Sequence, residues 1–130
     1  MLNSTEECLF CNKKKQKIIY STELMFLVRE SYPVTKLHTL IIPHRHISDF
    51  FDLNNDELKD LIKILKKERQ SLLDLDKEIT AFNVGVNAGE DSGQSIMHCH
   101  IHLIPRRKGD IENPRGGVRG VIPSKQKYNK

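Results

Sequence analysis

Histidine occupies every second position in the segment 98–102, with apolar residues between the histidines and after them. Side chains two residues apart project from the same face of a β-strand, whereas on a helix the same spacing scatters them around the axis. The segment therefore predicts a strand that carries His98, His100 and His102 on one face and apolar groups on the other. Burying several neutral imidazoles in a row is costly unless they bind something or do chemistry. We interpret the row as a functional site in preference to surface histidines on an exposed strand.

The other three histidines, His38, His44 and His46, stand close together in a second short segment. Surface histidines are scattered in most proteins, so the grouping of all six in two segments indicates a shared site. His38 shares a face with the end of a predicted strand. His44 stands beside Arg45 in the turn that follows and is expected to be exposed, whereas we expect His38 and His46 to be functional.

The segment 54–69 predicts one long helix. Asn54 is the expected N-cap, and Glu57, three residues later, is its capping-box partner. Its buried face is predicted from apolar residues at helical spacing: Leu58, Leu61, Ile62 and Leu65. The opposite face is rich in lysine and is interpreted as a solvated surface rather than a nucleic-acid site.

Apolar and β-branched runs predict further strands that begin at Ile18 and extend over 24–29, 37–42 and 79–87, the third ended by Pro43. Strands, one long helix and then strands again predict an α+β fold with a mainly antiparallel sheet. A length of 130 residues suits a single domain, 1–130, whose tail from about 109 to 130 is rich in Gly, Pro and Arg and is predicted to be irregular.

Composition excludes several classes of protein. No apolar run approaches the ~20 residues of a membrane span, and the segment 1–7 lacks the basic start and apolar stretch of a secretion signal. With three cysteines and no such signal, we expect a cytoplasmic protein with free or metal-bound thiols. The net charge of +4 suits an anionic small ligand, and an aromatic content of 6% gives no stacking platform for a specific nucleic acid.

The sequence carries neither the G-x-S-x-G elbow of serine hydrolases nor a phosphate-binding loop of the G-x-x-x-x-G-K-[ST] or G-x-G-x-x-G type. Two chemistries remain for the histidines. Two of them with a third ligand could hold a catalytic zinc ion, although three in a row on a strand converge on one ion only with difficulty. Alternatively, a neutral imidazole attacks phosphorus, its neighbours donate hydrogen bonds to the phosphate oxygens, and water completes the reaction without a metal in the chemistry.

Residues 98–104 fit the histidine-triad signature, in which three histidines alternate with apolar residues and two apolar residues follow. Similarity continues through 82–95, which leads from Phe-Asn-Val-Gly to Gly-Gln-Ser, through the Ile-Pro-Arg-Arg of 104–107, and through 33–46, which ends Ile-Ile-Pro-His-Arg-His. The chain thus resembles the histidine-triad family over nearly its whole length. The tail segment 109–119 resembles bacterial members described as diadenosine polyphosphate hydrolases.

This resemblance implies a homodimer whose sheets join into one continuous sheet. It implies a purine nucleotide or dinucleoside polyphosphate as ligand, and no organic cofactor. His100 would be the nucleophile that forms a nucleotidyl-histidine intermediate, supported by His98, His102 and His38. The positions that match substrate contacts are Asn87, Gln94 and Ser95 at the phosphate and Glu30 at the ribose hydroxyls, where the family more often has aspartate.

Cys8 and Cys11 form a C-x-x-C pair, which alone is half of a zinc site, a pair of free thiols or a redox motif. No thioredoxin-like helix start follows, which disfavours the redox motif. The resemblance implies a structural zinc ion in which His46 and His98 join the two cysteines. The remaining cysteine, Cys99, is interpreted as an apolar filler between histidines.

Three functions remain open at this point. The first is hydrolysis of dinucleoside polyphosphates or nucleoside phosphoramidates to a nucleoside monophosphate. The second is transfer of the nucleotidyl group to phosphate or a sugar phosphate; family transferases often replace the third histidine by glutamine, so His102 favours hydrolysis. The third is a non-catalytic nucleotide-binding module, which has no need of the nucleophile.

Two questions concern how the substrate is held. We expect residues such as Phe26, Leu27 and Ile42 to shape the pocket for the base. In the tail, Arg115 and Arg119 either reach the distal phosphates of a long substrate or are simply solvated.

Overall fold

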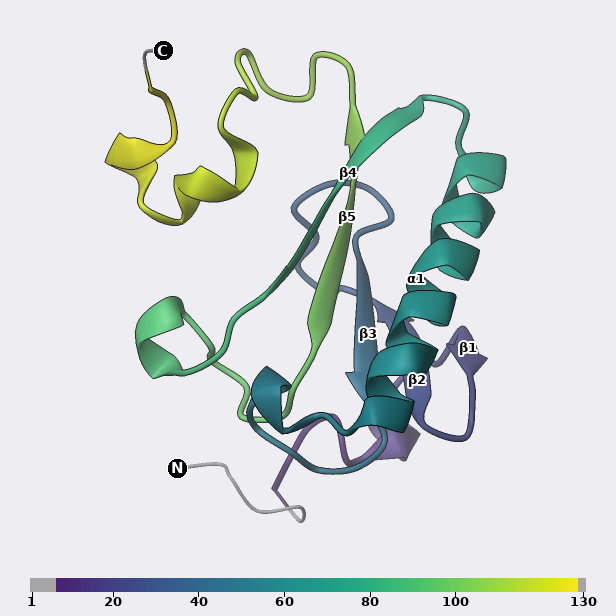
Figure 1. Cartoon of the computed structure of the whole chain (residues 1–130). Helices are drawn as coiled ribbons and strands as arrows, with labels where there is room; N and C mark the ends of the chain where they lie inside the picture. The colour runs from purple at the N-terminus through teal and green to yellow at the C-terminus, as the bar shows by residue number, and fades with distance from the viewer. Residues whose placement is uncertain (1–6, 129–130) are drawn as a thin grey trace.

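The computed structural model describes residues 7–128. Residues 1–6, which belong to the segment predicted to lack a secretion signal, and residues 129–130 of the predicted 1–130 domain lie outside this range. Five antiparallel strands form one sheet in the order β1-β2-β3-β5-β4, and one long helix packs on it (Figure 1). The elements are β1 Tyr20–Ser21, β2 Met25–Arg29, β3 Thr39–Pro43, α1 Asn55–Leu75, β4 Ile79–Val86 and β5 Ile101–Arg107. The predicted α+β class with a mainly antiparallel sheet is confirmed.

The two central strands β2 and β3 are buried on both faces. On one face, Met25, Leu27 and Ile41 pack beneath α1, which is why this helix needs an apolar stripe. On the other face, Phe26 and Val28 pack with the N-terminal Cys-x-x-Cys segment. The sheet therefore has a helix side and a second side, and the second side carries the histidines.

The segment boundaries differ from the predicted ones where backbone geometry intervenes. β5 begins at Ile101, so His98, in a bend, and His100 precede the strand and only His102 lies within it. The alternation still holds, because Cys99, Ile101 and Leu103 are buried in the core on the opposite side. β3 starts at Thr39, two residues later than predicted, and Pro43 is its last residue.

The helix is confirmed, but its buried face is rotated from the predicted one. Leu61 is buried as expected, whereas Leu58 is 37% and Ile62 53% exposed. Buried positions instead continue along the series Glu57, Leu61, Ile64, Glu68 and Leu72. The two glutamates were not expected inside; Glu68 is paired with Arg29 of β2, which satisfies its charge.

The first turn of α1 is tied to the turn that carries His44 and His46. Glu57 is 1% exposed, and its carboxylate accepts hydrogen bonds from the Asn54 backbone N–H at 2.9 Å and from Arg45 Nη2 at 2.7 Å. The Asn54 side chain in turn accepts from the Glu57 N–H, which completes the predicted capping box. One carboxylate thus caps the helix and anchors Arg45.

The C-terminal tail contains short 3₁₀ turns, Gly117–Val121 and Pro123–Lys125, which lie beside the outer end of the sheet. Within residues 7–128, no helix is both long and apolar enough to cross a membrane.

Replacing Glu57 by glutamine is expected to lower the free energy of unfolding by about 1–3 kcal/mol at pH 7, because the hydrogen bond to the Arg45 cation loses its ionic component. Burial alone would raise the pKa of Glu57, but the hydrogen bonds from Arg45 and Asn54 outweigh burial and hold it below its ordinary value of 4.5. A lowered folded-state pKa contributes stability above pH 4.5 that is lost as the pH falls through that pKa.

The difference between wild type and Glu57→Gln, measured by urea unfolding, should therefore shrink below about pH 4. The exposed Glu78→Gln is the matched control and should change stability by less than about 0.5 kcal/mol. Equal effects of the two substitutions at pH 7 would contradict the assignment.

Candidate functional site

Four potential metal ligands converge beside the sheet: Cys8, Cys11, His46 and His98, whose ligand atoms all lie within 4.8 Å of one another. The Sγ atom of Cys8 lies 3.3 Å and that of Cys11 3.5 Å from His98 Nδ1. His46 Nδ1 lies 3.2 Å from the Cys11 sulfur and 3.1 Å from His98 Nδ1. Tetrahedral zinc with bonds of about 2.0–2.3 Å would place its ligands about 3.3–3.8 Å apart, so this donor set fits a structural zinc ion.

The protonation state of His98 also suits a metal ligand. Its Nε2 lies 2.8 Å from the Pro43 carbonyl oxygen and must donate to it, so a neutral ring presents its Nδ1 lone pair to the two thiols. Burial lowers the pKa of His98 to about 4, which keeps the ring neutral. Burial and the neighbouring Cys8 raise the pKa of the Cys11 thiol to about 11, so thiolate ligation there requires the positive charge of a cation.

His100 is held with one nitrogen free. Its Nδ1 donates to the His98 carbonyl oxygen at 2.8 Å, so in the neutral ring Nε2 carries the lone pair. The side chain is 8% exposed and lines a cavity of about 410 Å³, here named the histidine pocket. The pocket is lined by Leu9, Phe10, Lys15, Gln16, residues 28–32, Leu40, Asn87, Gly93, Ser95, Ile96, His100 and His102.

A chain of hydrogen bonds sets the proton positions of the remaining two histidines. The Val34 backbone N–H donates to His38 Nδ1 at 3.0 Å, which leaves the proton of the neutral His38 ring on Nε2. His38 Nε2 lies 2.9 Å from His102 Nδ1 and donates to it, so His102 carries its proton on Nε2. Burial lowers the pKa of His38 and, to about 4, that of His102, so both rings are neutral at neutral pH. The site thus presents a lone pair on His100 Nε2 and an N–H donor on His102.

Three of the predicted substrate-contact residues, Glu30, Asn87 and Ser95, line the histidine pocket. Gln94 is placed differently. It is 5% exposed, and its side-chain oxygen accepts from the Gly89 N–H at 2.9 Å while its nitrogen donates to the Ser48 carbonyl at 2.8 Å. The Gln94 amide therefore holds the glycine loop 89–93 in place and is not among the residues that line the pocket.

The apolar wall of the pocket differs from the predicted one. Phe26, Leu27 and Ile42 are at most 1% exposed and belong to the core. The pocket is walled instead by residues such as Val28 and Leu40, which lie on the histidine side of β2 and β3. The expectation was wrong because apolar composition alone does not reveal which of two buried faces borders a cavity.

Phe10, a residue that the sequence patterns did not single out, contacts both parts of the site. It stands between the two cysteines, and its ring lies 5.9 Å from the His98 ring and 5.2 Å from the His100 ring, measured between centroids. The sequence signal for Phe10 is an aromatic residue between two cysteines that are themselves expected to bind a metal together with histidines of the site.

His44 lies outside both groups, as expected, although it is half-buried rather than exposed. Its Nε2 lies 3.1 Å from the Ser21 hydroxyl and 3.0 Å from the Thr22 carbonyl, so it links the turn after β3 to the β1–β2 connection. Arg115 and Arg119 fold back over the Tyr128 ring, with 5.4 and 4.7 Å from guanidinium carbon to ring centroid, and neither lines the histidine pocket.

Comparison with known proteins identifies relatives for most of the chain. The nitrilase and fragile histidine triad fusion protein NitFhit of Caenorhabditis elegans is 39% identical over 94 residues, which are 72% of this chain and 21% of that protein. The asymmetrical bis(5'-nucleosyl)-tetraphosphatase of Schizosaccharomyces pombe is 34% identical over 95 residues, 73% of this chain and 52% of that protein. The chain therefore spans about a fifth and about half of these two relatives.

The fold has a close match among solved structures. A Zn-bound histidine triad family protein from Mycobacterium smegmatis superposes with a TM-score of 0.76 at 24% identity, covering 85% of this chain and 82% of that one. The HIT domain matches residues 12–109, which include all six histidines and therefore two of the four metal-ligand candidates, His46 and His98. The chain belongs to the histidine-triad (HIT) domain family.

Proposed function

We propose that this protein is a nucleotide hydrolase that attacks the α-phosphorus of dinucleoside polyphosphates or nucleoside phosphoramidates and releases a nucleoside monophosphate. The observation that carries the proposal is the lone pair of His100 Nε2 at a pocket that also presents the His102 N–H. A relative is named as an asymmetrical tetraphosphatase, which supports the same class of substrate.

In the proposed first step, His100 Nε2 forms a bond to the α-phosphorus and the bond from phosphorus to the leaving oxygen or nitrogen breaks. Charge develops on the phosphate oxygens, which would accept hydrogen bonds from the Nε2–H of His102 and the hydroxyl of Ser95, two residues that line the histidine pocket with His100. Water then attacks the nucleotidyl-histidine, the N–P bond breaks, and His100 regains its lone pair. The carboxylate of Glu30 supports binding of the ribose hydroxyls, and the amide of Asn87 supports binding of the phosphate.

Structural zinc is part of the proposal. When bound by Cys8, Cys11, His46 and His98, the ion supplies positive charge that stabilises the thiolates. The residues themselves do the positioning: His98 offers its carbonyl oxygen to His100, and Phe10 packs on both rings. Loss of the cluster would therefore disturb the pocket as well as the fold.

Two alternatives use the same residues. A phosphorylase or transferase would pass the nucleotidyl group to phosphate or a sugar phosphate in place of water, and a binding module would stop at the nucleotide complex. The donor on His102 and the free nitrogen on His100 favour catalysis over simple binding.

The three cysteines, all free thiols, suit the reducing cytoplasm in which we propose the protein acts.

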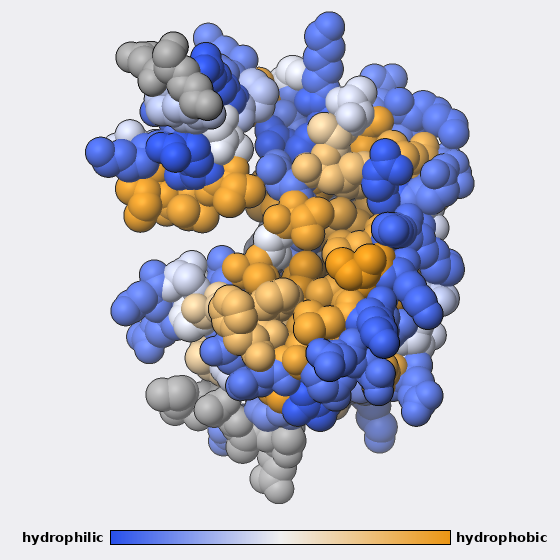
Figure 2. All heavy atoms as spheres, viewed as in Figure 1, coloured by the Kyte–Doolittle hydropathy of each residue, from blue (hydrophilic) through white to orange (hydrophobic). Residues whose placement is uncertain are grey.

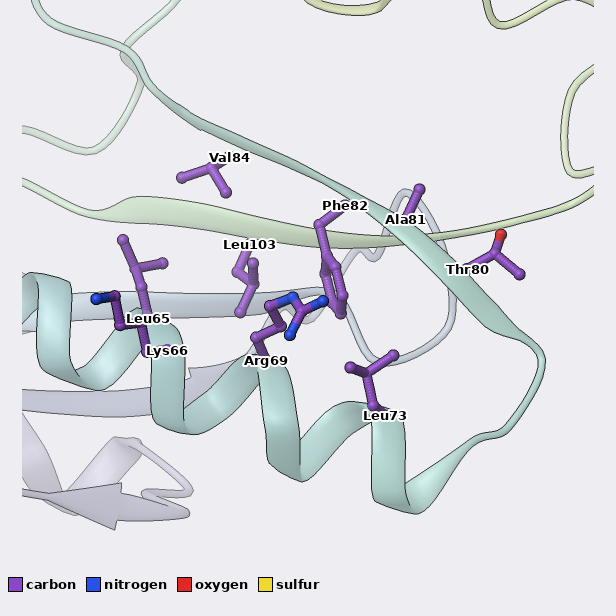
Figure 3. A pocket seen from close by; sticks show the side chains of 9 residues that line it. All are labelled: Leu65, Lys66, Arg69, Leu73, Thr80, Ala81, Phe82, Val84 and Leu103. Atoms are coloured by element: carbon purple, nitrogen blue, oxygen red, sulfur yellow. The ribbon is translucent and has the colours of Figure 1, made fainter.

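We also propose a homodimer joined at β4. This eight-residue strand is one edge of the sheet, whereas the other edge, β1, has two residues. Beside β4 lies a groove in which Leu65 and Leu73 of α1 face Phe82 and Val84 (Figure 3). Hydrophobic residues gather along this groove on the molecular surface (Figure 2). An unpaired strand edge next to an apolar groove supports pairing with a second copy of the chain, which would join the two sheets into one. Each chain would contribute a single domain to this dimer.

Substituting His100 with alanine should lower AMP formation from diadenosine tetraphosphate by more than about a thousandfold, because the attacking nitrogen is lost. Products are separated by chromatography, with and without added phosphate. AMP plus ATP indicates hydrolysis, and ADP plus ATP that depends on phosphate indicates a phosphorylase.

The matched control is His44→Ala, at a histidine in the turn after β3 that does not line the histidine pocket, and it should retain activity within about twofold. Wild-type protein that binds AMP but forms no product from either substrate class would contradict the proposed hydrolase.

Cys11→Ser should abolish stoichiometric zinc, measured by mass spectrometry of the purified protein, and lower hydrolysis about 10- to 100-fold through misplaced His98 and Phe10. The control is Cys99→Ala, which removes the one thiol outside the cluster and should retain zinc. Full zinc content in Cys11→Ser, or none in wild type purified with zinc present, would refute the metal assignment.

Val84→Asp should convert the dimer to monomers in light scattering, because Val84 is 48% exposed at the groove and a buried carboxylate opposes association. Ile19→Asp, at a position 43% exposed beside the other sheet edge, is the control and should leave the mass unchanged. A monomeric wild type, or a dimer that survives Val84→Asp, would argue against pairing at β4.

A further inference from the structure

A second cavity, of about 500 Å³, lies between the C-terminal tail and the histidine side of β4 and β5; we name it the tail slot. Its sheet side is formed by residues 83–87 with His102 and Ile104, and its tail side by Val118 and Val121. The molecular surface shows a hollow beneath the tail, and the tail surface that faces it is hydrophobic (Figure 2).

The tail slot adjoins the histidine pocket. His102 and Asn87 line both cavities, whereas His100 lines only the histidine pocket. A nucleotide held in the histidine pocket with its phosphorus at His100 must direct its leaving group out of that pocket. The tail slot shares His102 with the histidine pocket, so it is the neighbouring cavity that the leaving group would enter.

The lining of the slot favours a flat, uncharged group. Val118 and Val121 are 62% and 75% exposed and would be covered by an occupant. Gly85, which pairs with His102 across the sheet, leaves an open floor, because an added Cβ would meet no atom within 4 Å. The amide of Asn87 offers hydrogen bonds at the boundary with the histidine pocket. Apolar walls with a few polar groups are typical of sites for aromatic ligands.

The lining does not favour additional phosphates. The one arginine that borders the slot, Arg106, already donates to Asp110 through Nε and Nη2, both at 2.8 Å, and to Asn83 at 2.7 Å. The tail arginines, Arg115 and Arg119, lie over Tyr128 and are not among the slot residues. These three arginines are therefore engaged in contacts outside the slot.

The tail that forms the slot is an ordered part of the fold. Gly116 has a φ of +91°, and a Cβ there would come within 1.8 Å of the Gln126 carbonyl oxygen, so the two tail turns are closely packed on each other. Gly117 approaches the Asn83 side chain of β4, and Asn83 is held by Arg106. These contacts hold Val118 and Val121 above the sheet.

We propose that the tail slot binds the nucleobase of the leaving nucleotide. This inference rests on the proposed hydrolase function and refines it: substrates with a nucleoside at both ends are preferred over those with a small leaving group. The apolar side of the tail, rather than its arginines, recognises the distal part of the substrate.

The test compares diadenosine tetraphosphate with adenosine 5'-tetraphosphate, which has the same phosphates and lacks the second nucleoside. Binding is measured by calorimetry on the full chain in a His100→Ala background, which prevents turnover. Stacking of one base contributes enough that diadenosine tetraphosphate should bind about tenfold more tightly. Gly85→Val, which fills the floor, and Val121→Ser should bring the two affinities close to each other while AMP binds as before.

The matched control is Ile122→Ser, at a neighbouring tail residue that is 58% exposed and does not line the slot; it should retain the preference. Two results would overturn the proposal that the slot binds a nucleobase: equal affinities for the two tetraphosphates in the His100→Ala background, or a preference that survives Gly85→Val. If AMP still binds in either case, the hydrolase proposal is unaffected. Absence of AMP binding would instead overturn both. If Val121→Ser but not Ile122→Ser dissociates the dimer, a second copy of the chain occupies the slot and the proposal fails.

Discussion

The position of His98 is the constraint on which the rest of the site depends. Three of its polar groups have different partners: Nε2 donates to the Pro43 carbonyl, Nδ1 faces the cysteine sulfurs, and the backbone carbonyl accepts from His100. A hydrogen bond to the backbone of β3 therefore fixes the His98 ring, the ring faces the cysteine pair, and the His98 carbonyl orients His100. The candidate metal ligands and the proposed catalytic histidines share this one residue, although its exposed fraction is zero and it does not line the histidine pocket.

The parts of the fold that follow from local rules could be predicted from the sequence. The capping box at Asn54 and Glu57 depends on residues three apart, and the alternation around His100 depends on residues two apart, so both are visible in one dimension. The family resemblance rested on the same short-range patterns. It correctly indicated the α+β fold and the histidine-triad family, and the structure places Cys8 and Cys11 beside His46 and His98.

Features that depend on contacts between distant segments could not be predicted in this way. Gln94 has an ordinary loop sequence around it, and only the fold shows that its amide is committed to Ser48, 46 residues away. The burial of Glu68 depends on Arg29 reaching it from a strand 39 residues earlier. Phe10 reaches the histidines only because the N-terminal segment covers the second face of the sheet. The spacing of apolar residues indicates which face of a segment is buried, but it does not indicate which other segment packs against that face.

The hydrogen-bond chain from the Val34 backbone through His38 to His102 has a consequence for how the protein responds to its surroundings. Because a main-chain amide determines where the first proton sits, the arrangement exists before any substrate arrives and requires no proton to move when one binds. Burial lowers the pKa of His102 to about 4, so moderate acidification of the surroundings leaves its ring uncharged. The proton positions along this hydrogen-bond chain are thus insulated from changes in acidity that would alter an exposed histidine.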